Sequence, residues 1–379
     1  MATYKIPFNR PGLVGKELMY IADAILRGQT AGDGIYTRRC HEFLERELGC
    51  AHVLLTTSCT HALELCAMLL AIQPGDEVIL PSFTFVSTAN AFVRAGAKPV
   101  FVDIRPDTLN MNERLLEDLI TERTKAIAPV HYAGVGCEMD EIQAIAGRHG
   151  IKIVEDNAHG LFARYKGKYL GTFGQLATQS FHETKNVICG EGGALVINDP
   201  EYFERAEIMR EKGTNRGRFY RGEVDRYTWV DVGSSYLPSD LLAAFLLAQL
   251  EKYDEIRETR RKIWDMYAGG LRNWANASGV CLPRAPKHTE HSYHMFYLVM
   301  PSLEARTRLI EHLKARGVQA VFHYVPLHLS EMGQRLGGRE GDCPITESVS
   351  NRLLRLPFYN DLSDQEQSEV IEGVCAFRC

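Results

Sequence analysis

The chain has 379 residues, a formal net charge of −5 at pH 7, 45% hydrophobic residues and 24% charged residues. These values are typical of a globular protein with one large domain and a smaller one, and they lack the basic excess that would make nucleic acid the main partner. No stretch reaches the roughly 18 uncharged apolar residues of a membrane span, and the first residues carry no signal-peptide core. The ten cysteines show no metal-like spacing, which favours reduced thiols, no metal site and a cytoplasmic protein.

The first half of the chain alternates between helical and strand patterns. Helical periodicity covers residues 14–27 and 36–48, which a glycine-rich bend separates. The strands predicted next are 52–55, 77–80, 100–103, 126–130 and 151–155. The helices predicted between them are 60–72, 87–94, 113–121 and 138–148. This alternation predicts an α/β fold with a mostly parallel sheet covered on both faces, in which ligands bind beyond the carboxyl ends of the strands.

A long helical pattern marks the predicted boundary between two domains. Apolar residues recur at helical spacing from 239 to 271, a length that commonly bridges domains. We therefore expect a large domain over residues 1–250 and a smaller α/β domain over residues 251–379. Before the long helix, the pattern predicts a hairpin at 162–171, strands at 175–181 and 193–198 and a helix at 200–211. After it, strands are expected near 294–300 and 318–322, and helices near 303–315, 345–354 and 364–377.

Lys185 is a candidate nucleophile. It follows an apolar, β-prone run and precedes Gly190, Gly192 and Gly193, so we expect it on a tight loop at a strand end. A lysine amine attacks aldehydes only when it is positioned and partly desolvated, as in the Schiff bases of pyridoxal phosphate (PLP). An exposed surface lysine is the ordinary alternative, and the partners of Lys185 must decide between the two.

Two acids, Glu155 and Asp156, end a β-branched strand and point to opposite faces by strand alternation. A carboxylate at a strand end can keep a pyridinium nitrogen protonated, which makes the pyridine ring an electron sink. Asp156 is the candidate for this role. Taken alone, an aspartate in this position is more often a cap or turn residue. The hypothesis that Asp156 binds a cofactor therefore depends on its occurrence together with Lys185.

Two further segments follow strand ends. Ser58-Cys59-Thr60 precedes a predicted helix, where it either cradles a phosphate or simply caps the helix. The segment 81–86 carries Phe83 and Phe85, each of which is either a stacking face for a ring or core packing. The basic segment 212–218 is either solvated or able to hold phosphate near a site.

Together these stretches resemble the DegT/DnrJ/EryC1/StrS family, PLP enzymes that aminate keto sugars attached to nucleotides. The resemblance covers nearly the whole chain and implies an aspartate-aminotransferase-like (fold type I) architecture. The matching segments are Gly32-Asp33-Gly34, Ser58-Cys59-Thr60, Pro81-Ser82-Phe83-Thr84-Phe85, Pro129-Val130-His131-Tyr132-Ala133-Gly134, Val154-Glu155-Asp156, Ser180-Phe181-His182-Glu183-Thr184-Lys185-Asn186, Gly190-Glu191-Gly192-Gly193, and His323-Tyr324-Val325-Pro326-Leu327-His328.

The resemblance also implies roles for individual residues. Lys185 would form the Schiff base and shuttle protons, and Asp156 would pair with the pyridine nitrogen. The other implied cofactor contacts are stacking by Phe85, a contact of His159 with the phenolic oxygen, and phosphate contacts by Cys59, Thr60 and Ser180. The family places the segment 323–328 near the sugar nucleotide, so His323 and Tyr324 are candidate substrate contacts, and Lys212 and Arg216 of the basic segment are further candidates.

One segment departs from the family pattern. Family members usually carry Asn in a Gly-x-Asn-Tyr-Arg segment that reaches the phosphate site of the neighbouring subunit, whereas this chain has Gly233-Ser234-Ser235-Tyr236-Leu237. Ser235 retains a hydrogen-bond donor, but the arginine is missing. The resemblance still implies a homodimer with active sites at the interface.

The segments 180–186 and 234–237 look closest to the branch that makes dTDP-4-amino-4,6-dideoxyhexoses. This implies ping-pong transfer of an amino group from L-glutamate to C4 of dTDP-4-keto-6-deoxy-D-glucose, with pyridoxamine phosphate (PMP) as the intermediate cofactor form. The alternatives are amination at C3, a related sugar 3-dehydratase and a non-catalytic PLP-binding regulator. The dehydratases carry histidine in place of the lysine, and no DNA-binding appendage supports a regulator. Galacto or gluco stereochemistry at C4 stays open.

Overall fold

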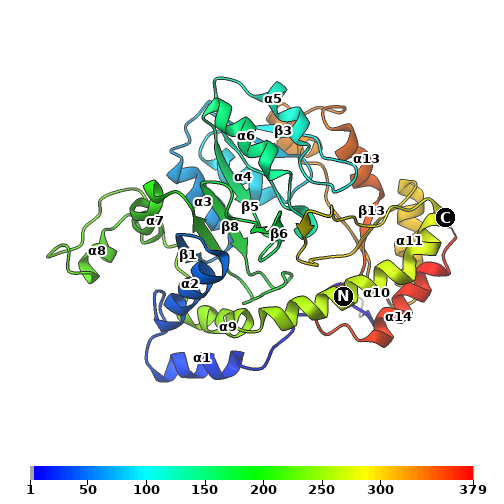
Figure 1. The fold of residues 1–379 in the computed structure, drawn as a ribbon, viewed down its shortest axis with the longest axis horizontal. Helices are drawn as coiled ribbons and strands as arrows, with labels where there is room; N and C mark the ends of the chain where they lie inside the picture. Colours follow the sequence, from blue (N-terminus) through cyan, green and yellow to red (C-terminus); the bar gives the residue numbers. More distant parts are fainter. Residues whose placement is uncertain (1–3, 379) are drawn as a thin grey trace.

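A seven-stranded sheet forms the centre of the computed structural model, which describes residues 4–378 (Figure 1). The strand order is β1-β9-β8-β5-β4-β2-β3. The strands are β1 (His52–Thr56), β2 (Glu77–Pro81), β3 (Lys98–Val102), β4 (Thr124–Ile127), β5 (Lys152–Asp156), β8 (Leu176–Ser180) and β9 (Gly193–Ile197). From β3 to β8 all neighbours are parallel, and β9 runs antiparallel to both β8 and β1. The sheet is therefore mostly parallel, as the sequence predicts.

Helices cover both faces of this sheet, because its strands carry apolar residues on both sides. One face packs against α3 (Cys59–Leu69), α4 (Val86–Arg94) and α7 (Phe203–Arg210). The other face packs against α6 (Met139–His149) at one end and against α2 (Ile35–Leu48) and α9 (Asp240–Leu250) at the other. The shorter or peripheral helices here are α1 (Glu17–Leu26), α5 (Leu116–Leu119) and α8 (Arg216–Tyr220).

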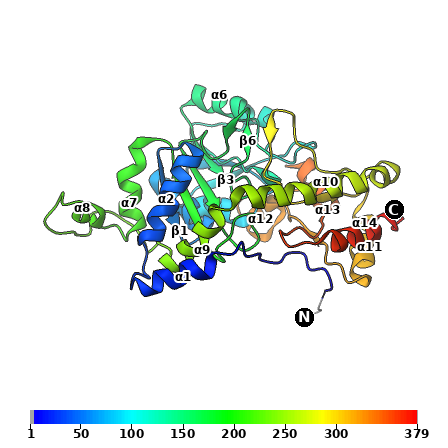
Figure 2. The same ribbon diagram turned by 60° about the horizontal axis from the view of Figure 1, so that its bottom comes forward.

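The single long helix predicted over residues 239–271 is wrong, because the structure has two helices there (Figures 1 and 2). α9 ends at Leu250, and α10 runs from Tyr253 to Ser278. Lys252 leaves the helical conformation, with φ −111° and ψ 14°. Next to it, the Glu251 carboxylate accepts hydrogen bonds from the side chains of Lys16, Tyr20 and Arg39. Contacts with the N-terminal helices thus accompany the break, which a local pattern does not reveal.

The C-terminal part has its own apolar core, formed by residues of 263–377 together with Ile6 from the N-terminal segment. It holds a three-stranded antiparallel sheet, β11-β13-β12, formed by Tyr297–Val299, Leu353–Arg355 and Val321–Phe322. Its helices are α11 (Leu303–Ala315), α12 (Glu331–Arg335), α13 (Pro344–Arg352) and α14 (Asp364–Cys375). A third small sheet joins β6 (Arg164–Tyr165), β7 (Lys168–Tyr169) and β10 (Thr289–Glu290). The division at residue 250 stays a prediction.

Glu155 ties the end of the sheet to the loop before β8. Its side chain is fully buried and accepts backbone hydrogen bonds from Gly171 (2.8 Å), Phe173 (2.7 Å) and Gly174 (2.7 Å). His131 Nε2 lies 2.9 Å from the same carboxylate. Every carboxylate oxygen is therefore occupied by structural partners, so Glu155 supports the fold while its neighbour Asp156 is left for the site.

Glu155→Gln is expected to destabilise the protein by about 3–5 kcal/mol, because an amide presents N–H groups to donors that need an acceptor. Urea unfolding followed by circular dichroism measures this change. The matched control is Glu372→Gln on α14, where the side chain is exposed. The free energy of unfolding of this variant should stay within about 0.5 kcal/mol of that of the unmodified protein. Equal free energies of unfolding for the two variants would contradict the structural role of Glu155.

No helix within residues 4–378 is long and apolar enough to cross a membrane. The nine cysteines in that range are all free thiols.

Candidate active site

A cavity of about 740 Å³ opens beyond the carboxyl ends of β5 and β8, where the sequence places its candidate residues. Its wall combines residues of the large sheet with residues of the C-terminal part, including Met295 and Phe358. The predicted site residues that line it are Cys59, Thr60, Phe85, Asp156, His159, Ser180, Lys185, His323 and Tyr324. These residues come from strand ends and helix starts that are far apart in the sequence, and the fold brings them into one cavity.

Lys185 lies on a closed loop between β8 and β9. Backbone hydrogen bonds from Phe181 to Gly192 and from Glu183 to Gly190 hold the loop, and the Lys185 N–H donates to the His182 carbonyl at 2.9 Å. Burial lowers the pKa of the Lys185 amine to about 8, although Cys59 and Asp156 nearby act in the opposite direction. A lysine with a lowered pKa carries a larger fraction of the neutral nucleophilic amine, the form that Schiff-base chemistry requires, than an exposed lysine does.

Asp156 ends β5 and presents its carboxylate to the cavity. The Thr88 hydroxyl donates to Oδ2 at 2.7 Å, and the Ala158 N–H donates to Oδ1 at 3.2 Å. The side chain is 5% exposed. These donors orient the carboxylate at a buried position, where it is suited to hold a cationic ring nitrogen.

The first turn of α3 forms a cradle for an anion. Ser58 caps the helix by accepting a hydrogen bond from the His61 N–H at 3.1 Å, which leaves Cys59 and Thr60 at the positive end of the helix. Gly193 is required for this approach, since a Cβ there would lie 2.3 Å from the Cys59 nitrogen. Burial raises the pKa of the Cys59 thiol to about 12, with Asp156 adding to the effect, so the thiol is neutral beside an anion.

The two phenylalanines after β2 have different surroundings. Phe83 is 1% exposed and packs against Tyr132 and Tyr324, whereas Phe85 is 57% exposed and lines the cavity. Phe83 is therefore core packing, and Phe85 offers an open ring face. Together with Lys185, Asp156 and the start of α3, this set of groups fits PLP, which needs an amine, a carboxylate, a phosphate cradle and a stacking face.

His294 is a cavity residue that the sequence analysis missed. Its ring stacks on His159, with centroids 4.2 Å apart and planes 18° apart, and its Nδ1 lies 2.9 Å from Asn186 Oδ1. Burial lowers the pKa of both histidines well below the usual value, so both rings are neutral near pH 7. Among residues 4–378, His159 Nδ1 has no hydrogen-bond partner although it is buried. A polar ring atom is thus left for a bound molecule.

Arg260 on α10 clamps the backbone that carries His294. It donates from Nη2 to the His294 carbonyl at 2.6 Å and from Nε to the Tyr293 carbonyl at 3.0 Å. Tyr293 has φ +54°, a left-handed conformation that non-glycine residues rarely adopt. Asn186, next to Lys185, donates to the Ser292 carbonyl at 2.7 Å. The long helix therefore positions one wall of the cavity against the lysine loop.

Ser235, Lys212 and Arg216 do not line this cavity in the single chain. They belong to residues 211–235, here called the arm, which carries α8 and extends away from the body of the chain (Figures 1 and 2). Lys212 pairs with Glu211 at 2.9 Å, and Arg216 contacts the same acid at 3.3 Å. Exposed apolar side chains of the arm include Trp229 (76%) and Val232 (56%).

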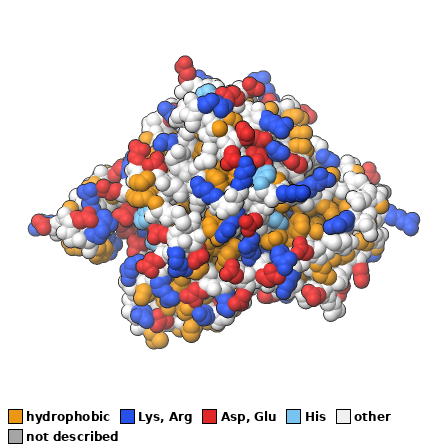
Figure 3. Space-filling view, in the orientation of Figure 1, with side chains coloured by type: hydrophobic (Ala, Val, Ile, Leu, Met, Phe, Trp, Pro, Cys, Tyr) orange, Lys and Arg blue, Asp and Glu red, His pale blue; other side chains and the backbone are white. Residues whose placement is uncertain are grey.

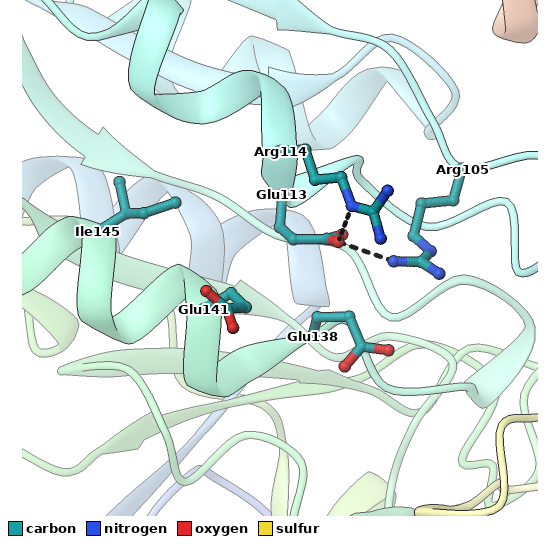
Figure 4. A pocket seen from close by; sticks show the side chains of 6 residues that line it. All are labelled: Arg105, Glu113, Arg114, Glu138, Glu141 and Ile145. Carbon is teal, nitrogen blue, oxygen red and sulfur yellow. Dashed lines mark hydrogen bonds and ion pairs between the residues drawn. The ribbon is translucent and has the colours of Figure 1, made fainter.

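A second hollow of about 530 Å³ has a different character (Figure 4). It is lined by Arg105, Glu113, Arg114, Glu138, Glu141 and Ile145. Figure 4 shows Arg105 and Arg114 both directed to the Glu113 carboxylate, with separations of 2.7 and 3.7 Å. Figure 3 shows blue and red side chains mixed across the molecular surface in this view. The hollow contains no lysine, cysteine or serine nucleophile, so the reactive groups gather in the larger cavity.

The comparison with protein families decides the class of the enzyme. A profile of the DegT/DnrJ/EryC1/StrS aminotransferase family matches residues 14–375. The chain belongs to this family. It is therefore a PLP-dependent aminotransferase with the fold of type I PLP enzymes, as the resemblance of its motifs implies.

Individual members of the DegT/DnrJ/EryC1/StrS family match over almost the full length. The spore coat polysaccharide biosynthesis protein SpsC of Bacillus subtilis is 32% identical, covering 97% of this chain and 96% of SpsC. The Streptococcus pneumoniae protein Spr1654, solved in PLP and PMP forms, is 29% identical with a TM-score of 0.90, covering 98% of both chains in the PLP form. DesV of S. venezuelae, solved with a ketimine intermediate, is 32% identical with a TM-score of 0.89, covering 98% of both chains.

The lowered pKa of Lys185 predicts how this family member captures its cofactor. Because the neutral amine is the nucleophile, the rate at which cofactor-free protein binds PLP covalently is expected to rise as the pH increases through about 8. Stopped-flow absorbance at a series of pH values measures this rate. A rise centred near 10.5, the ordinary lysine value, would show that burial does not tune the amine.

Proposed function

We propose that the protein transfers an amino group from L-glutamate to C4 of dTDP-4-keto-6-deoxy-D-glucose, giving a dTDP-4-amino-4,6-dideoxyhexose. The main observation in support of aminotransferase activity is the buried Lys185 amine, which shares one cavity with Asp156 and the phosphate cradle of α3. The choice of sugar is supported by the segments 180–186 and 234–237, which resemble the branch that makes these amino sugars. The name of the relative SpsC refers to polysaccharide biosynthesis, and this supports a sugar product.

PLP, when bound, supplies the electron sink and carries the amino group between the two substrates. The chain's own residues then have separable tasks. Lys185 Nζ takes and returns the proton in each half of the reaction, which its neutral amine permits near pH 8. Asp156 holds the ring nitrogen, and the N–H groups at the start of α3 with Thr60 hold the phosphate. Burial of these groups keeps water from the reacting atoms.

His323 and Tyr324 are proposed contacts for the sugar nucleotide. Both line the cavity, and His323 Nδ1 lies 3.0 Å from the Tyr132 hydroxyl. Burial lowers the pKa of His323 well below its usual value, so this side chain meets the substrate as a neutral hydrogen-bonding group. A neutral group suits recognition of sugar hydroxyls, since it needs no counter-charge.

The proposal includes a homodimer whose arm, residues 211–235, reaches the neighbouring active site. Two features support it: Ser235 is exposed, and the arm presents apolar side chains to solvent. Lys212 and Arg216 would then serve the partner's substrate rather than their own. A monomer in sedimentation velocity at working concentration would contradict this part. The cytoplasmic location expected from the sequence also belongs to the proposal.

The decisive experiment supplies the protein with PLP, L-glutamate and dTDP-4-keto-6-deoxy-D-glucose. Glutamate alone should remove the visible absorption band of the lysine-bound cofactor, and adding the keto sugar should restore it. Proton couplings of the product, read by NMR, distinguish C4 from C3 amination and galacto from gluco stereochemistry. Loss of the band with glutamate but no aminated dTDP sugar would contradict the choice of substrate. Release of a hydroxyl from C3 would instead indicate a dehydratase.

A further inference from the structure

Arg355 is a cavity residue with no assigned task. It is the last residue of β13, the central strand of the C-terminal sheet, and its side chain lines the same cavity as Lys185. The guanidinium lies over the ring of Phe8, 4.5 Å from its centroid, and Phe8 also lines the cavity. The N-terminal segment and β13 thus hold this cation at the wall of the site.

The Arg355 guanidinium lacks an anionic partner. Within residues 4–378 it forms no ion pair and no hydrogen bond, and its Nε is a buried donor without an acceptor. Burial lowers the pKa of Arg355, while the hydroxyls of Tyr132 and Tyr324 act in the opposite direction. An arginine stays protonated in proteins. A buried charge without a partner is costly, so an unpaired guanidinium at a cavity wall indicates an anionic ligand.

The surroundings of Arg355 distinguish it from ordinary buried arginines of this chain. Arg260 is also buried without a carboxylate, but it donates to the carbonyls of Tyr293 and His294 and to Asn360 Oδ1 at 3.0 Å. Its donors are therefore satisfied by the fold. Those of Arg355 are not, although the two side chains belong to the same part of the chain.

The type of anion follows from the shape of the group and its place. A guanidinium presents a planar fork that matches a carboxylate with two parallel hydrogen bonds. Arg355 and Lys185 line the same cavity, so an anion bound by the guanidinium shares that cavity with the amine that reacts. In an α-amino acid the carboxylate and the amino group share one carbon. In a sugar nucleotide the sugar ring separates C4 from the diphosphate.

We propose that Arg355 binds the α-carboxylate of the amino donor through its guanidinium and thereby directs the donor's amino group toward Lys185. This inference rests on the proposed function, since it assigns the donor subsite of that reaction. Phe8 lies against the guanidinium and forms an apolar wall that shields the ion pair from water, and Phe358 lines the same cavity. The subsite is formed by the C-terminal part of the chain together with Phe8, whereas the phosphate cradle lies at the start of α3.

The test separates the two halves of the reaction in the PLP-loaded enzyme. Arg355→Gln should reduce kcat/KM for discharge of the absorption band by L-glutamate by about 100-fold, because a buried charged hydrogen bond is lost. Discharge by 4-aminobutyrate, an amine that lacks the α-carboxylate, should be unchanged by the substitution. The rate at which the PMP-loaded enzyme aminates the keto sugar should also be unchanged. Arg355→Lys should recover part of the glutamate rate.

Arg352→Gln is the matched control, because Arg352 is a half-exposed arginine at the C-terminal end of α13 that does not line the cavity, and it should leave all three rates unchanged. Loss of the keto-sugar half alone in Arg355→Gln would overturn the proposal in favour of diphosphate binding. Equal loss in both halves with a lower melting temperature would indicate a structural role and overturn it as well. If glutamate and other α-amino acids fail to discharge the unmodified enzyme, the proposed function is at fault rather than the subsite.

Discussion

Lys185→Ala is expected to lower the rate of amino transfer by about 10⁴-fold, because under the proposed function it removes both the amine that binds the cofactor and the group that moves the proton. The variant should still bind PLP through the cradle of α3 and Asp156, but without the covalent link. Borohydride treatment followed by mass spectrometry measures the link directly. The reduced cofactor should be attached to a peptide containing Lys185 in the unmodified protein and absent from the variant.

Lys262→Ala provides the control for Lys185→Ala, since Lys262 is an exposed lysine on α10 with 71% of its side chain accessible. Its activity and cofactor content should match those of the unmodified protein. Full turnover of the keto sugar by Lys185→Ala would remove the central assignment. Adding a small primary amine to the inactive variant provides a further check, because a diffusible base restores part of the proton transfer if the lysine acts as general base.

Asp156→Asn is expected to reduce both half-reactions by about 200–5,000-fold, which corresponds to the roughly 3–5 kcal/mol lost when one partner of a buried charge pair is removed. An amide cannot stabilise a positive charge on the ring nitrogen, so the electron sink weakens. The rates of band discharge by glutamate and of band recovery with the keto sugar measure the two halves separately.

Thr88→Val tests the orientation of the same carboxylate. Thr88 donates to Asp156 Oδ2 at 2.7 Å, and losing one hydrogen bond costs about 1 kcal/mol, so a reduction of about 5-fold is expected. The effect of Thr88→Val should therefore be much smaller than that of Asp156→Asn. Asp156→Asn with unchanged rates would exclude a role of the carboxylate in the chemistry.

The sequence predicts those residues of the site that belong to local sequence motifs. Lys185, Asp156 and Cys59 each stand where a strand meets a loop or helix, and parallel strands bring such positions to one edge. Their place in the cavity thus follows from alternation of strands and helices. The fold class and most elements of the large sheet are predicted for the same reason.

His294 and Arg355 were not predicted because nothing in their local sequence marks them. His294 follows Tyr293, which has a left-handed conformation, and Arg260 donates to the backbone carbonyls of both residues. Arg355 lies where we expected a helix to have just ended, but Leu353–Arg355 form a strand between two others. Tertiary contacts, rather than helical periodicity, determine both positions.

Strand β9 sets the order in which this protein can be assembled. β1 lies at the edge of the large sheet and joins it through β9, which also pairs with β8. During synthesis, residues 52–56 must therefore wait for residues 193–197 before they acquire this partner. Pairings between distant segments are slow steps in folding. The lysine loop spans the turn from β8 to β9, so the strand whose pairing with β8 closes this loop is also the strand onto which β1 docks.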